Sequence, residues 1–142
     1  MKYRMRPTPK DIRAQFRLFN AYHFRGLLPP VALRWRPLET AYAVWYYPEP
    51  RWPNGCIVLS AHDDAACGWR GVLLHECIHA WLELRYGYDF EADTSAESEH
   101  HGPVFTRECN RIGARLGLPP IDEDSSWSWP HGLWVPSVDL GY

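Results

Sequence analysis

A membrane-spanning segment is the first feature that the sequence lacks. A transmembrane helix needs about 20 consecutive, predominantly apolar residues, and the 142-residue chain contains no run of that kind. Residues 1–7 carry three positive charges but not the apolar segment of a secretory signal. We therefore expect a cytoplasmic protein with no membrane partner.

The cysteines lack the spacing of a zinc ribbon. There are four of them, and no two form a C-x-x-C pair: Cys56, Cys67, Cys77 and Cys109. Paired cysteines at that spacing hold structural zinc, so the sequence excludes this type of metal site. In a cytoplasmic protein all four are expected to be reduced thiols.

Length and composition predict one folded domain. A chain of 142 residues can bury a core, and an apolar fraction of 46% with eight tryptophans argues against disorder. Residues 121–142 contain no Lys or Arg, but three consecutive acids and three tryptophans. We expect a domain over residues 1–120 and an acidic, Trp-rich tail over residues 121–142 that packs on or beside it.

Positive charge is concentrated near the N-terminus. Residues 1–36 contain nine Lys and Arg against one acid, whereas the whole chain has a net charge of −2. From charge alone two interpretations stay open: the segment contacts phosphates, or it forms a solvated helix face.

The order of apolar patterns predicts a small α+β domain. A first helix is expected to begin after Thr8, which can cap it, and to end near Gly26. A second helix, over about residues 68–85, is expected to stop at Gly87, and a last helix to open at Pro103. Alternating or β-branched runs predict three strands, at residues 31–35, 41–47 and 56–60.

The run His75-Glu76-Cys77-Ile78-His79 indicates a metal site. Residues four apart lie on one face of a helix, so both imidazoles can bind one ion. Glu76 is placed to accept the proton of a metal-bound water without being a ligand. This arrangement is typical of catalytic zinc, with one Zn²⁺ expected per chain. The alternative is a chance pattern in a chain with seven histidines.

A third protein ligand is expected after His79, because catalytic zinc usually takes three. The pattern H-E-x-x-H-x-x-G-x-x-H is excluded, since Leu82 and Arg85 stand where it requires Gly and His. From the residues alone four candidates stay open: Glu97, Glu99, His100 and His101.

The segment His101-Gly102-Pro103-Val104-Phe105 resembles the H-G-x-x-F element that follows the metal helix in SprT-like, or Spartan-type, zinc metallopeptidases. Four more segments resemble pieces of this family in order and spacing: residues 19–28, 31–35, 57–60 and 73–80. The resemblance covers about residues 12–118. It does not include the C-terminal zinc ribbon of the bacterial SprT type, because no cysteine follows Cys109.

This resemblance implies a zincin-like fold and a zinc-dependent metalloendopeptidase. It implies His75, His79 and His101 as metal ligands and Glu76 as the general base. His101 also lies just before Pro103, where the start of a helix would hold a ligand in place.

Members of the family act on protein bound or crosslinked to DNA, so the resemblance implies a protein substrate and single-stranded DNA as a candidate partner. Arg13, Arg17 and Arg25 are our candidates for contacts with DNA. A set of aromatic residues could stack on unpaired bases, although such residues are more often part of the core: Trp45, Tyr46, Tyr47 and Trp52.

The substrate could pair with the strand at residues 56–60 if that strand borders the cleft, with Ile57 and Leu59 beside it. Two alternatives stay open: a nucleic-acid-binding domain that contains zinc but has little turnover, and a zinc peptidase without a DNA role. Glu76 favours an enzyme, because a structural zinc site does not need it. No pattern in the sequence predicts the oligomeric state.

Overall fold

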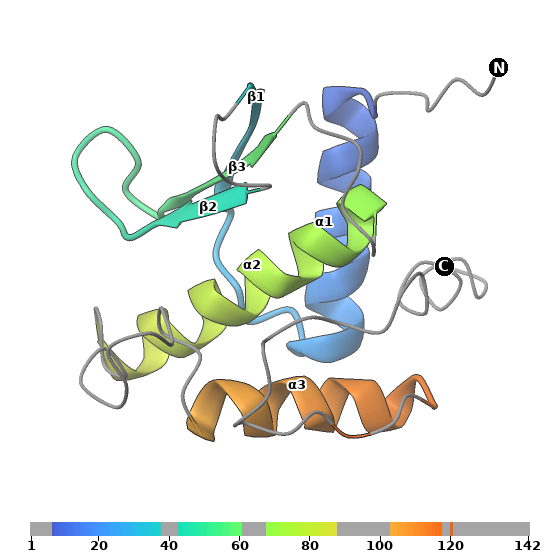
Figure 1. The fold of residues 1–142 in the computed structure, drawn as a ribbon. Coiled ribbons are helices and arrows are strands. Elements are labelled where there is room, and N and C mark those ends of the chain that lie inside the picture. The colour runs from blue at the N-terminus through green and yellow to red at the C-terminus, as the bar shows by residue number, and fades with distance from the viewer. Residues whose placement is uncertain (1–6, 38–42, 61–67, 88–102, 118–119, 121–142) are drawn as a thin grey trace, which may run out of the picture.

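The computed structural model describes residues 7–37, 43–60, 68–87, 103–117 and 120. These residues form three helices and a three-stranded sheet, in the order α1 Pro9–His23, β1 Ala32–Arg36, β2 Ala43–Tyr46, β3 Cys56–Ser60, α2 Gly68–Tyr86 and α3 Pro103–Arg115 (Figure 1). The predicted α+β class is therefore confirmed. The predicted tail over residues 121–142 lies outside the described residues, and its packing stays a prediction.

Helix α1 begins at the expected cap. The Thr8 hydroxyl accepts a hydrogen bond from the Asp11 amide at 3.1 Å, and the Asp11 carboxylate accepts one from the Thr8 amide at 3.0 Å. This reciprocal pair satisfies two amides that no helical carbonyl can reach. The helix ends at His23, three residues earlier than the predicted stop near Gly26.

The turn after α1 is held by the side chain of Asn20. Its amide donates to the Leu28 carbonyl at 3.0 Å and accepts from the Leu28 amide at 2.9 Å. A single side chain therefore satisfies both backbone groups of Leu28 and directs the chain toward β1.

The sheet has the strand order β1-β3-β2. Strand β3 pairs in parallel with β1 and antiparallel with β2. Directly paired residues point to the same side, and one side packs against the core shared with the helices: Leu33, Trp35, Ala43, Trp45, Ile57 and Leu59.

The central position of β3 corrects one prediction. All five of its residues pair with β1, and four of them also pair with β2. Ile57 and Leu59 are 0% and 1% exposed. Because both backbone edges of β3 are occupied, the prediction that a substrate pairs with this strand beside Ile57 and Leu59 is wrong.

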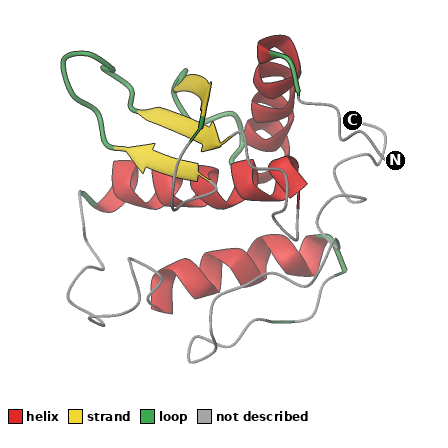
Figure 2. Ribbon diagram, turned by 45° about the horizontal axis from the view of Figure 1, so that its top comes forward, coloured by secondary structure: helices red, strands yellow, loops and turns green. Residues whose placement is uncertain are grey.

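Helix α2 lies between the sheet and α3, and α1 packs against both α2 and β1 (Figures 1 and 2). Helix α2 stops just before Gly87, as the sequence predicted. Gly87 has a φ of 105°, and its amide donates to the Glu83 carbonyl at 2.8 Å. Because α2 contacts the sheet and both other helices, the metal motif lies on the most enclosed helix of the described fold.

No helix within the described ranges is long and apolar enough to cross a membrane.

Candidate metal centre

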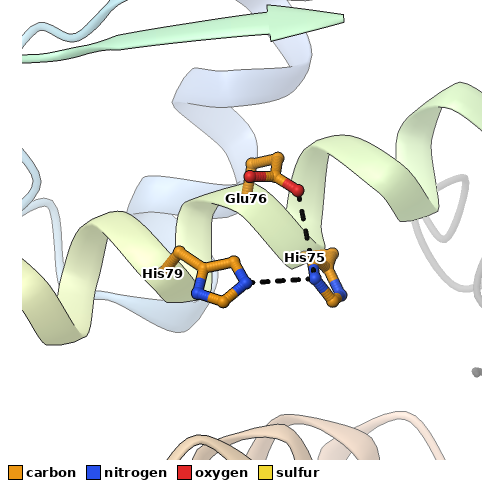
Figure 3. Close-up of side chains that lie close together, drawn as sticks. All are labelled: His75, Glu76 and His79. Atoms are coloured by element: carbon orange, nitrogen blue, oxygen red, sulfur yellow. Dashed lines mark hydrogen bonds and ion pairs between the residues drawn. The ribbon is translucent and has the colours of Figure 1, made fainter. Parts of the chain in front are cut away.

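His75 and His79 project from the same side of α2 (Figure 3). Their Nε2 atoms lie 3.2 Å apart. Both side chains are partly buried, whereas the intervening Cys77 and Ile78 are fully buried. The predicted helical spacing therefore brings two nitrogen ligands together at a position that solvent can still reach.

The distance between these nitrogens fits a zinc ion. Two nitrogens bound at about 2.0–2.1 Å from a tetrahedral zinc should lie roughly 3.3 Å apart, and the observed distance is 3.2 Å. Among the described residues His75, Glu76 and His79 form a group whose possible ligand atoms all lie within 4.8 Å of one another. The two imidazoles can hold the metal without rearrangement of the helix.

Phe105 of α3 supports both imidazoles. Its ring centroid lies 5.1 Å from that of His75 and 4.4 Å from that of His79, and its side chain is fully buried. Phe105 is the aromatic residue of the H-G-x-x-F segment, so this part of the pattern packs directly against the predicted ligands. The contact fixes the orientation of the rings from outside α2.

The predicted third ligand precedes helix α3. Helix α3 begins at Pro103, two residues after His101. The four candidates lie outside the described residues: Glu97, Glu99, His100 and His101. The choice of His101 therefore stays a prediction.

Glu76 is a buried carboxyl group next to the two imidazoles. One of its oxygens lies 3.9 Å from Nε2 of His75. Burial, together with the charge of the nearby Glu83, raises the pKa of Glu76 to about 8. A cation held by the imidazoles would act in the opposite direction, because an adjacent positive charge favours the ionised carboxylate.

The described cysteines are structural. Cys56, Cys77 and Cys109 are free thiols with at most 1% exposure. Burial raises the pKa of each, well above its ordinary value for Cys77 and Cys109. None is a nucleophile, since the reactive thiolate is disfavoured in these positions.

Glu83 is a buried residue that the sequence reasoning missed. It is 6% exposed, and its Oε1 atom accepts a hydrogen bond of 3.1 Å from the indole Nε1 of Trp45. A glutamate seven residues after Glu76 lies on nearly the same face of a helix. This spacing is the sequence feature that could have placed Glu83 near Glu76. The indole partner on β2 could not be found from spacing.

The structure also places the predicted DNA-contacting residues. Arg13, Arg17 and Arg25 are exposed, two on α1 and the third just after it. Trp45 packs against the core, as expected for most aromatic residues, whereas Tyr46 is 39% exposed. Contact of these residues with DNA stays a prediction.

Comparison with known proteins agrees with this geometry. The chain matches the SprT-like family over residues 12–124. It is also 32% identical over 118 residues to a protein of Danio rerio named DNA-dependent metalloprotease SPRTN. The alignment covers 78% of this chain but only 17% of that relative. The match over most of the chain, together with the paired histidines on α2, shows that this protein belongs to the SprT-like family.

Proposed function

We propose that this protein is a zinc-dependent metalloendopeptidase that cleaves proteins bound or crosslinked to DNA. The observation that carries the proposal is the 3.2 Å separation of the His75 and His79 Nε2 atoms, with the Glu76 carboxyl group beside them. A structural zinc site would have no use for a buried carboxyl group next to its ligands.

The metal would be held by His75, His79 and His101. When bound, zinc supplies a Lewis acid for the scissile carbonyl and lowers the pKa of water. Phe105 keeps the first two imidazoles in place, because its buried ring packs against both.

Glu76 would carry a proton from the attacking water to the leaving amine. It accepts a proton from the attacking water and returns it to the amine that leaves when the peptide bond breaks. The carboxyl group lies buried beside the imidazoles. A cation held there would favour its ionised form, which is the form that accepts the proton.

Strand β2 replaces β3 as the proposed partner of the substrate backbone. It pairs with β3 along one edge, and no described strand pairs with its other edge. An extended peptide can add to such an edge through main-chain hydrogen bonds. Cleavage by this route would depend little on the substrate's side chains.

Two surfaces support single-stranded DNA as a partner. The first consists of three exposed arginines, Arg13 and Arg17 on α1 and Arg25 just after it. The second is the side of the sheet away from the core, where alternation places Arg34 and Arg36 of β1 and Tyr46 of β2.

The second surface continues into the β2–β3 turn. The ring of Trp52 lies 5.4 Å from that of Tyr46, and the Arg51 guanidinium lies 4.4 Å over Trp52. Arginines beside exposed aromatic rings are typical of surfaces that bind unpaired bases. The name of the Danio rerio relative, a DNA-dependent metalloprotease, supports the same partner.

A cleavage assay tests the proposal. Wild-type protein and Glu76→Gln should be compared on a DNA-binding protein substrate, with and without single-stranded DNA. We expect cleavage by the wild type, stimulation by DNA, and no cleavage by the variant despite normal zinc content. Cleavage without any effect of DNA would indicate a peptidase without a DNA role. DNA binding without cleavage would indicate a zinc-containing binding domain.

A further inference from the structure

Glu83 and Trp45 connect the metal helix to the edge of the sheet. Trp45 is one of the four residues of β2 and pairs with Ile57 of β3. Its indole donates to Oε1 of Glu83 at 3.1 Å. Glu83 lies four residues, or about one turn, after His79 on α2.

The burial of Glu83 is costly. Its side chain is among the buried charged residues, with 6% exposure. Moving a carboxyl group out of water is unfavourable unless hydrogen bonds compensate for the lost hydration. An apolar residue would fill the same position on a buried helix face without this cost, so the carboxyl group requires a specific explanation.

Gly55 holds the other side of the Trp45 ring. A Cβ atom at this position would collide with the six-membered part of the indole. Gly55 also has φ of 87°, a conformation that side chains rarely adopt. The indole is therefore fixed by close backbone contact on one side and by the Glu83 hydrogen bond on the other.

We propose that Glu83 is a positioning residue for the substrate. Through its hydrogen bond with the Trp45 indole, Glu83 holds β2 at a fixed distance and in a fixed register relative to α2. A substrate strand paired with the edge of β2 that no described strand occupies is then presented to His75 and His79 in one register. This inference rests on the proposed peptidase function and on β2 as the strand that binds the substrate.

Three substitutions separate positioning from other roles of Glu83. Glu83→Gln keeps an oxygen that can accept from the indole, but removes the charge. Glu83→Leu removes both at similar volume, and Trp45→Phe removes the donor. If Glu83 acts through its charge on Glu76, the Gln and Leu variants should be equally impaired; if it acts by position, Gln should restore function.

We expect hydrogen exchange at the β2 amides to become about tenfold faster in Glu83→Leu and in Trp45→Phe, since each change leaves the remaining buried or partly buried polar group without this hydrogen bond. Glu83→Gln should stay within about twofold of the wild type. The double variant Glu83→Leu with Trp45→Phe should exchange no faster at β2 than either single variant, because both changes remove the same hydrogen bond. KM should rise about tenfold with kcat nearly unchanged, as for lost substrate binding.

Glu108→Leu provides the matched control. Glu108 lies on α3 and pairs with Arg111, so its loss should change neither β2 exchange nor KM. Wild-type exchange at β2 in both Glu83→Leu and Trp45→Phe would overturn the proposal, as would equal impairment of the Gln and Leu variants. If Glu83→Leu does not fold, Trp45→Phe and Glu83→Gln still distinguish positioning from an effect of the Glu83 charge. If the wild type cleaves nothing, the peptidase function fails, while exchange still tests the link between Glu83 and β2.

Discussion

The ring of Phe105 on α3 lies 4.4 Å from the ring of His79 on α2. The same phenylalanine contacts His75, so one buried side chain supports both histidines that the sequence predicts to be metal ligands. Residues around a metal ligand determine how it is oriented, and their loss weakens metal binding even though they never touch the ion.

Phe105 should therefore matter for both stability and zinc affinity. Phe105→Ala should lower the free energy of unfolding by about 3–5 kcal/mol, as expected for a buried phenylalanine. Phe105→Leu should retain more of that stability but bind zinc about tenfold more weakly, because a leucine cannot support both rings. Urea unfolding of the metal-free protein and zinc titration measure the two effects separately. Unchanged zinc affinity in Phe105→Leu would show that the contact serves packing alone.

Zinc content should identify the third ligand. The purified protein should contain about one zinc per chain, and alanine at His75, His79 or His101 should remove most of it, because three-ligand sites depend on each bond. Elemental analysis of the purified variants provides the measurement.

Alanine substitutions at the competing candidates, Glu97, Glu99 and His100, are the controls for this prediction. They should leave zinc content unchanged. Normal zinc in His101→Ala, together with loss in one of the controls, would move the third ligand to that residue.

His23 should make the protein sensitive to mild acid. The imidazole is 2% exposed, and neither of its nitrogens has a hydrogen-bond partner among the described residues. Burial, assisted by the charges of Arg115 and Arg111, lowers the pKa of His23 to about 4 from 6.5. The unfolded chain therefore takes up a proton below pH 6.5 that the folded chain refuses until about pH 4, and stability falls over that range.

The His23 contribution to the free energy of unfolding should fall by about 2 kcal/mol between pH 7 and pH 5. In the metal-free protein the raised pKa of Glu76 acts in the opposite direction, so the quantity to compare is the difference between the wild type and His23→Leu. Urea unfolding with a chelator present excludes effects of metal release. Relative to His23→Leu, which fills similar space without a titrating group at this position, the wild type should lose about 2 kcal/mol over this range. An equally steep loss in that variant would assign the acid sensitivity to other groups.

The salt dependence of DNA binding should distinguish the two basic surfaces. Each lost phosphate contact reduces the log–log slope by about 0.7 for single strands. Replacing Arg13, Arg17 and Arg25 with Gln should weaken binding and reduce the slope by roughly 2 if all three contact phosphates. Arg107→Gln, an exposed site on α3, is the control.

The corresponding change on the sheet is Arg34→Gln with Arg36→Gln, combined with Trp52→Ala to test base stacking. We expect weaker binding in fluorescence anisotropy titrations and no change in zinc content. Unchanged affinity at low salt in both sets of variants would rule out DNA contact by either surface.

Local features of this protein could be predicted from the sequence because their interactions are short in range. The Thr8 cap depends on residues three positions apart. The pairing of His75 and His79 follows from the helical repeat alone. The α+β class and the approximate bounds of each element came from the same kind of pattern.

Contacts between distant segments depended on the tertiary structure. The β-branched run at residues 56–60 is compatible with an edge or a central strand, and only its pairing with both neighbours showed that it is central. The bond between Trp45 and Glu83 joins residues 38 positions apart. Such contacts form only when the chain closes long loops, and apolar periodicity records which face is buried, not which residue will lie against it.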